Sequence, residues 1–182
     1  MKKILAFLFV LTIGSLTSSQ LKAQGFGVGL AIGTGLEDWE GGSGIGIGLL
    51  GSYSAPINTK IRYAVDLAFY LPSSGDFDID FLGTKVKVSS TIMQFEVNGN
   101  AHYIFNTTET MEIYGIGGLQ FAYKSVTVDV SGADSVSESD NAIGVNLGAG
   151  ANFKVGGSKL FAELKYTAGG FGQLQIATGI RF

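Results

Sequence analysis

The last ten residues of the chain, Gln173-Leu-Gln-Ile-Ala-Thr-Gly-Ile-Arg-Phe182, show a pattern that recurs along the whole sequence. Glutamines, small residues and one arginine occupy the odd positions of this segment. The even positions carry Leu174, Ile176, Thr178, Ile180 and Phe182. A period of two is the pattern of a β-strand with one apolar face. The segment therefore predicts a final strand that ends the chain on an aromatic residue.

The same alternation appears in seven earlier segments, which gives eight candidate strands. In the third segment, for example, Tyr63, Val65 and Leu67 alternate with Ala64 and Asp66. About ten residues at ~3.3 Å each, tilted near 40°, rise roughly 25 Å, which matches the apolar band of an outer membrane. The predicted strands are residues 25–33, 45–54, 60–70, 91–105, 111–123, 142–154, 159–167 and 173–182.

The N-terminal residues have the composition of an export signal. Met1-Lys2-Lys3 precedes an apolar run from Ile4 to Ile13 and a polar stretch that ends at Leu21-Lys22-Ala23. A basic start, an apolar run of about ten residues and a small residue at the cleavage position are typical of a secretory signal peptide. We therefore expect residues 1–23 to be a signal peptide and residues 24–182 to form one domain.

The composition excludes several classes of function. Without Lys2, Lys3 and Lys22, nine Lys and Arg remain against 15 Asp and Glu, which disfavours nucleic acid as a partner. The absence of Cys excludes thiolate chemistry, and a single His disfavours a His-based metal site. The chain has 28 Gly and a mean hydropathy of +0.31, yet residues 24–182 contain no apolar run near the roughly 18 residues of a membrane helix. Such an exported chain is commonly a transmembrane β-barrel.

Alternation alone does not say which face is inside, because a soluble lipocalin-like barrel buries the apolar face that a membrane barrel shows to lipid. The connections favour the membrane barrel. They are long at 34–44, 71–90 and 124–141, moderate at 168–172, and short at 55–59, 106–110 and 155–158. With both termini in the periplasm, every short turn lies on the periplasmic side. Aromatic residues on the apolar face also gather near both ends of the strands, and the two interfaces of a bilayer favour aromatic side chains at these positions.

Three stretches resemble strands of one known family: Ile113-Tyr-Gly-Ile-Gly-Gly-Leu-Gln-Phe121, Gly148-Ala-Gly-Ala-Asn-Phe153 and Ala177-Thr-Gly-Ile-Arg-Phe182. With them, the chain resembles the small outer-membrane barrels of the OmpX/Ail type and, more distantly, the transmembrane domain of OmpA-like proteins. The resemblance covers the mature chain and implies an all-β fold, an eight-stranded antiparallel up-and-down transmembrane β-barrel in the bacterial outer membrane. It also implies a C-terminal signal for the assembly machinery, formed by Leu174, Ile176, Ile180 and Phe182, although Ile180 stands where an aromatic is common.

Near the expected outer rim, the apolar residues change between even-numbered and odd-numbered positions. Val86 and Val88 are even-numbered, whereas the apolar residues from Met93 onward are odd-numbered, and the mirror change follows Tyr123, at Val126. We expect a bulge in each of the strands 91–105 and 111–123 there, with a β-ribbon above the membrane. A partly unpaired ribbon edge can dock another chain, and in the resembling family such edges serve adhesion and surface interactions. Alternatively, the pairing only orders long loops.

Acidic residues are concentrated in the three long connections. The order of charges in residues 76–87 predicts a hairpin with Asp76, Asp78 and Asp80 opposite Lys85 and Lys87. The acidic loops could also bind divalent cations that bridge them to lipopolysaccharide phosphates, although no spacing resembles a calcium loop. The ten acidic residues are Glu37, Asp38, Glu40, Asp76, Asp78, Asp80, Asp129, Asp134, Glu138 and Asp140.

Charged residues on the polar parity should lie inside the barrel. Side chains fill the interior of an eight-stranded barrel, so we expect these charges to pair with one another and to form a lumen polar network. A small channel for ions or small solutes is the alternative, because lumen glycines could leave room for water. The network residues are Arg62, Asp66, Glu96, Glu112, Glu163, Lys165 and Arg181.

No arrangement of residues indicates an enzyme or a cofactor. His102 has no Ser on its own parity nearby, and the glycine-rich segments lack the following helix of a phosphate site. The predicted function is an integral outer-membrane barrel with a structural or surface-interaction role, in envelope integrity or adhesion. A small pore and, third, a lipid-modifying enzyme that uses His102 are the alternatives. The expected partners are outer-membrane lipids and lipopolysaccharide, the assembly machinery, and an extracellular protein at the ribbon.

Overall fold

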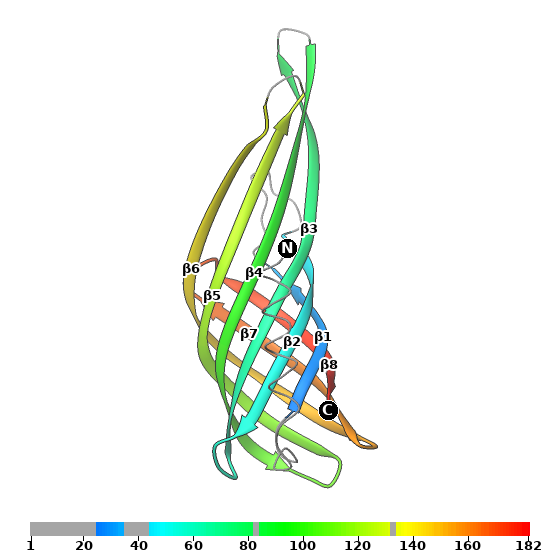
Figure 1. The fold of residues 1–182 in the computed structure, drawn as a ribbon, viewed down its shortest axis with the longest axis vertical. Helices are drawn as coiled ribbons and strands as arrows, with labels where there is room; N and C mark the ends of the chain where they lie inside the picture. The colour runs from blue at the N-terminus through cyan, green and yellow to red at the C-terminus, as the bar shows by residue number, and fades with distance from the viewer. Residues whose placement is uncertain (1–24, 35–43, 82–83, 132–133) are drawn as a thin grey trace, which may run out of the picture.

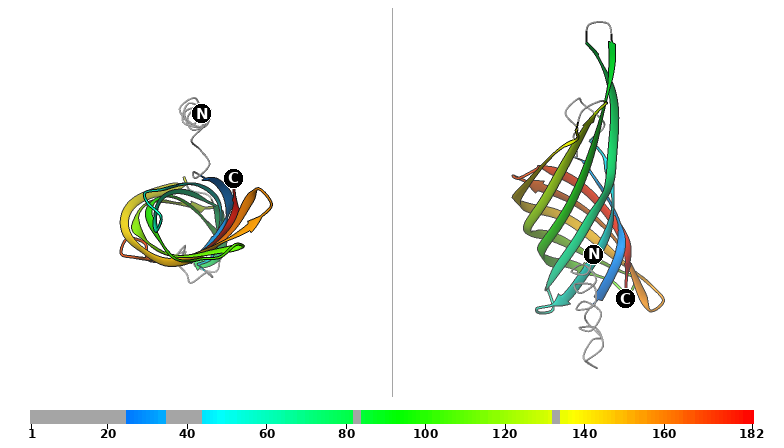
Figure 2. Two further views of the ribbon diagram at one scale, coloured as in Figure 1. Left: turned by 90° about the horizontal axis from the view of Figure 1, so that it is seen from below. Right: turned by 45° about the horizontal axis from the view of Figure 1, so that its top comes forward.

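The chain forms a closed barrel of eight antiparallel strands in the computed structural model, which describes residues 25–34, 44–81, 84–131 and 134–182 (Figure 1). Each strand pairs with its neighbours in chain order, and β1 pairs with β8 to close the ring seen in Figure 2. The predicted fold class is thereby confirmed. The strands are β1 (Gly25–Gly33), β2 (Gly46–Pro56), β3 (Ile61–Phe81), β4 (Thr84–Thr107), β5 (Met111–Val130), β6 (Val136–Val155), β7 (Ser158–Ala168) and β8 (Gln173–Arg181).

The predicted signal peptide, and Glu37, Asp38 and Glu40 of the first long connection, lie outside the described residues. Within the described part of the chain, no helix is long and apolar enough to cross a membrane.

The apolar face of the strands points outward. Val65, Leu147 and Ile176 are 41%, 60% and 54% exposed, whereas Asp66 and Glu96 are 1% and 0% exposed. A soluble barrel would show the opposite distribution, because water would surround the charged face. The polarity is therefore that of a membrane barrel, with an apolar outer surface and a polar interior.

Four strands continue well beyond the others on one side of the barrel (Figure 1). Pairing of β2 with β3 ends at Gly48↔Tyr70, and pairing of β6 with β7 begins only at Val145↔Ala168. We call the part beyond these pairs the protruding sheet: residues 71–81 of β3, 84–93 of β4, 124–130 of β5 and 136–144 of β6. Most of the connections 71–90 and 124–141 is therefore strand.

The hairpin at the tip of the protruding sheet has the predicted register. Asp78 lies opposite Lys87, and Asp80 lies opposite Lys85. Opposite charges in directly paired positions stabilise a hairpin by a few tenths of a kcal/mol per pair.

The bulges expected in β4 and β5 near the outer rim are wrong. The β4–β5 register runs without a shift from Val88↔Val130 to Ile104↔Tyr114. The register shift near the outer rim lies in the β3–β4 pair, between Tyr70 and Ser73, where Pro72 follows Leu71. Proline has no N–H to give to a strand ladder and is therefore tolerated at bulges.

The parity change has a different cause. Val88 and Ile92 are 4% and 5% exposed and lie on the inner parity of β4, together with buried Gln94. In the membrane, lipid accepts the apolar side chains on the outside. Above the membrane water replaces lipid, which favours the inward position of Val88 and Ile92 at the outer end of β4. We therefore infer that the outer boundary of the membrane crosses β4 near this change of parity.

Candidate functional site

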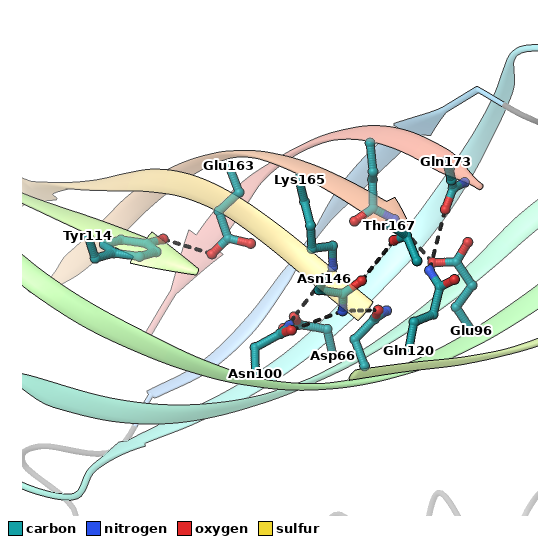
Figure 3. Close-up of polar contacts among 12 residues, drawn as sticks. Asp66, Glu96, Asn100, Tyr114, Gln120, Asn146, Glu163, Lys165, Thr167 and Gln173 are labelled. Atoms are coloured by element: carbon teal, nitrogen blue, oxygen red, sulfur yellow. Dashed lines mark hydrogen bonds and ion pairs between the residues drawn. The ribbon is translucent and has the colours of Figure 1, made fainter. Parts of the chain in front are cut away.

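A hydrogen-bonded ion pair closes the periplasmic half of the lumen. Arg181 of β8 donates from Nη2 to Glu163 Oε1 of β7 over 2.7 Å. Tyr114 of β5 donates its hydroxyl to the same oxygen over 2.7 Å and accepts from Arg181 Nη1 over 3.1 Å. Figure 3 shows Tyr114 pointing across the interior at Glu163. The guanidinium also lies 4.2 Å from the centre of the Phe161 ring. All four side chains are buried, so the charges are neutralised within the barrel.

A second ion pair lies beside the first, nearer the periplasmic rim. Arg62 Nη2 donates to Glu112 Oε1 over 2.7 Å, and both side chains are slightly accessible to solvent. Asn152 joins the two pairs because it donates to Glu112 Oε1 over 2.8 Å and accepts from Arg181 Nη1 over 2.7 Å. One polar network thus ties together five strands, β3, β5, β6, β7 and β8.

Amides and one lysine fill the middle of the lumen (Figure 3). Asp66 Oδ2 accepts from Asn100 Nδ2 over 2.9 Å and lies 4.0 Å from Lys165 Nζ. Asn146 Nδ2 donates to Asn100 Oδ1 over 3.0 Å, and Asn146 Oδ1 accepts from Thr167 over 2.8 Å. This chain of hydrogen bonds spans the barrel from β3 to β7.

Glutamines surround the remaining carboxylate, Glu96, toward the outer end. Gln94 Nε2 donates to Glu96 Oε1 over 2.7 Å, and Gln175 Nε2 donates to Glu96 Oε2 over 3.3 Å. Gln175 and Gln173 also donate to the hydroxyl of Tyr70, over 2.6 and 3.0 Å. Glu96 forms none of the ion pairs among the described residues. Amide donors rather than a paired cation therefore satisfy its carboxyl oxygens.

His102 is buried in the lumen and stacks on the Tyr114 ring, with the ring centroids 4.6 Å apart. Neither ring nitrogen has a hydrogen-bond partner among the described residues. A general base needs a partner that orients it and a nucleophile within reach, and this structure places neither at His102. In the described ranges, no three His, Cys, Asp or Glu side chains lie close enough to hold a metal ion together.

The structure brings all seven residues of the expected lumen network to the inner face of the barrel. Arg62 with Glu112, Arg181 with Glu163, and Lys165 with Asp66 are the three pairs within 4.0 Å, while Glu96 stands apart. The prediction considered only charges and so missed the neutral members of the network. Their signal was present in the sequence, because each occupies the inner parity of its strand: Tyr70, Gln94, Asn98, Asn100, Tyr114, Asn146, Asn152, Thr167, Gln173 and Gln175.

The residues of the expected C-terminal signal lie on the opposite, outer face of β8. Leu174, Ile176 and Phe182 are exposed on the barrel surface, and Ile180 is half-buried. The amide of Phe182 donates to the carbonyl of Phe26 over 2.8 Å, which extends the β1–β8 closure to the last residue.

The protruding sheet has two edge strands, each of which pairs with only one other strand among the described residues. On the β6 side, residues 136–144 pair only with β5, and the β7–β8 turn lies against Ala142 and Ile143 at Gly170. On the β3 side, residues 71–81 pair only with β4. Six acidic side chains of this region are exposed: Asp78, Asp80, Asp129, Asp134, Glu138 and Asp140. An exposed strand edge with free backbone groups is a template for another extended chain.

One protein-family model, described as the outer membrane protein beta-barrel domain, matches residues 4–179. The chain belongs to this family. As an outer membrane β-barrel protein, it is located in the bacterial outer membrane. No curated protein sequence matches the chain.

Solved structures of other outer membrane barrels have the same fold as this family member. Ail of Yersinia pestis, in complex with the heparin analogue sucrose octasulfate, gives a TM-score of 0.55 at 16% identity, over 88% of this chain and 97% of that chain. OprG of Pseudomonas aeruginosa gives a TM-score of 0.54 at 13% identity, over 87% of this chain and 95% of that chain. Neisserial surface protein A gives a TM-score of 0.52 at 20% identity, over 87% of this chain and 95% of that chain. At these identities the likeness concerns the fold alone.

Proposed function

We propose that this outer membrane barrel is a surface-interaction protein whose protruding sheet docks an extracellular partner. The observation that carries the proposal is the pair of strand edges, residues 71–81 and 136–144, that extend beyond the barrel with one side unpaired among the described residues. An added strand gains main-chain hydrogen bonds along its whole length, so such an edge provides affinity without a pocket. Ail, a barrel of similar fold, was solved with a heparin analogue bound, which supports ligand binding as a use of this fold.

In this proposal the lumen has a structural role. The Arg181–Glu163 and Arg62–Glu112 pairs, and the amides above them, link strands across the interior. A rigid barrel of this kind holds the protruding sheet at a fixed height above the bilayer. Outer-membrane lipids and lipopolysaccharide surround the apolar outer face, residues 1–23 direct export, and the C-terminal residues serve assembly.

The proposal is tested by shortening the β3–β4 and β5–β6 connections to the level of the membrane. The trimmed protein lacks residues 74–90 and 127–138, with two-residue Asn-Gly turns in their place. Cells that display either form are measured for adhesion to immobilised matrix proteins and to cultured epithelial cells, with outer-membrane amounts matched by heat-shifted gel mobility. Loss of adhesion in the trimmed form is expected. Equal adhesion of both forms at equal amounts would contradict the proposal.

A further inference from the structure

The two unpaired edges of the protruding sheet differ in how their charges are compensated. On β3, Asp78 and Asp80 lie opposite lysines in the hairpin register, at Lys87 and Lys85, whereas Asp76 lies opposite Ser89. On β6, Glu138 lies opposite Val126, and only Asp140 lies opposite a base, Lys124. Residues 124–141 contain four acidic residues and that single lysine. Residues 71–90 contain three acidic residues and two lysines, so the β6 side carries the larger excess of negative charge.

The β6 edge is also long enough to hold a strand. Residues 136–144 pair only with β5 among the described residues, and the β7–β8 turn lies against residues 142–144, because a Cβ at Gly170 would come within 3.1 Å of Ala142 Cβ and 3.2 Å of the carbonyl oxygen of Ile143. The open part of the edge is therefore residues 136–141, which at ~3.3 Å per residue extend roughly 20 Å. Residues 136–141 are exposed, including Glu138 and Asp140, and Asp134 just before the strand is exposed as well. A strand added here would meet backbone donors and acceptors together with several carboxylates.

We propose that the open part of the β6 edge, residues 136–141, binds an extended segment rich in lysine or arginine by adding it as a further strand of the sheet. This inference rests on the proposed function and names its partner class. Backbone hydrogen bonds would supply the sequence-independent part of the affinity. The carboxylates of Asp134, Glu138 and Asp140 would select basic side chains and reject acidic ones, because like charges across a strand pair are destabilising.

A second copy of this chain fits the β6 edge poorly. Two copies in one membrane run β6 in the same direction, so their edges could pair only in parallel, and in register Glu138 and Asp140 of each copy would lie beside the same residues of the other. The four carboxylates would repel one another, and the one lysine opposite them in each copy is Lys124. A basic segment of another protein removes this repulsion, so charge complementarity favours it.

The test uses the full-length protein in phospholipid nanodiscs and three nine-residue fluorescent peptides. The first alternates lysine and threonine, the second alternates glutamate and threonine, and the third has the charge of the first but contains two prolines that prevent strand pairing. Anisotropy at low salt gives the Kd of each peptide. Amide hydrogen exchange shows where each one binds. The lysine–threonine peptide is expected to bind at least about tenfold more tightly than the other two and to protect the amides of residues 136–141.

Two double variants with the same change of charge locate the site. Glu138→Lys with Asp140→Lys should weaken binding of the lysine–threonine peptide about tenfold, whereas Asp78→Lys with Asp80→Lys, at the other edge, should change it less than about threefold. Equal binding of the proline-containing peptide, or equal effects of the two variants, would overturn the proposal. Protection of residues 136–141 by the glutamate peptide would also overturn it, while leaving edge docking as the proposed function intact. Failure of the proposed function itself would appear separately, as unchanged adhesion of the trimmed protein.

Discussion

Arg181 and Glu163 form a 2.7 Å ion pair inside the barrel, between the last strand of the chain and the strand before it. In the backbone register Arg181 pairs with Lys159, so its side chain reaches along the barrel axis to meet Glu163, which pairs with Ala177. Both side chains are almost fully buried. The closing strand is therefore held from inside by a charge pair as well as by its backbone hydrogen bonds to β1 and β7.

Replacing Arg181 with alanine should cost about 3–5 kcal/mol of unfolding free energy, because Glu163 would remain as a buried, uncompensated charge. Urea unfolding of the refolded barrel in detergent or lipid measures this cost. Arg62→Ala should cost less, because the Arg62–Glu112 pair is partly accessible to water. The exposed Lys154→Ala serves as the control and should change stability by less than about 0.5 kcal/mol. Equal stability of the Arg181→Ala protein and the wild type would show that the pair does not hold the lumen together.

Paired glycines make the β1–β8 seam sensitive to a single methyl group. Gly29 lies opposite Gly179, and a Cβ at Gly179 would come within 2.2 Å of the carbonyl oxygen of Val28. Gly179→Ala should therefore destabilise the barrel by about 1–3 kcal/mol and slow its closure. Heat-shifted gel mobility over the time of refolding measures both effects. Gly99→Ala is the matched control, because a Cβ there has no atom within 4 Å. A similar refolding rate for the two variants would contradict the close approach at the seam.

The terminal aromatic residue should matter for assembly and little for stability. Phe182 is 67% exposed, so Phe182→Ala removes few packing contacts. If the C-terminal strand is the signal that the family resemblance implies, the variant should reach the outer membrane in reduced amount in cells. Its urea midpoint after refolding in vitro should stay near that of the wild type. A normal amount of the variant in the outer membrane would show that Phe182 is not part of an assembly signal. A lowered urea midpoint would show that the residue stabilises the folded barrel.

The lumen should not conduct ions. Ion pairs cross its periplasmic half, and the amides of Asn100 and Asn146 with Thr167 cross its middle, so a permeating ion would have to lose its water without replacement. Single-channel recording of the purified protein in planar bilayers should show no steps above background at 1 M KCl. Reproducible steps from the wild-type protein would favour the small pore over a lumen filled by side chains.

The period of two in the sequence predicted the fold because the outer and inner faces of a membrane barrel have opposite chemistry. Val65 and Asp66 illustrate this, since adjacent residues point to lipid and to the lumen. The position of the outer bulge was missed because it depends on Pro72, whose missing N–H is a backbone effect that a count of apolar residues does not detect.

The pairing inside the lumen was harder to predict than its composition. Tyr114 and Glu163 belong to β5 and β7, which are not neighbours, so their hydrogen bond depends on the diameter and stagger of the closed barrel. Asn152 joins two ion pairs for the same reason. A single sequence shows which side chains point inward, but not which of them meet across the interior.

The direction of the side chains is tested most directly by spin labels on single-cysteine variants, which the absence of native cysteine makes simple. Labels at Val65, Leu147 and Ile176 are compared with labels at the inner positions Ser52, Ala68 and Ala122, with the protein in lipid bilayers. Collision rates with oxygen, which dissolves in lipid, and with a water-soluble nickel complex are measured for each label. The account predicts high oxygen and low nickel accessibility at the first three positions and low oxygen accessibility at the inner three. High nickel accessibility at Val65, Leu147 and Ile176 would contradict the account, because water rather than lipid would then surround the apolar face.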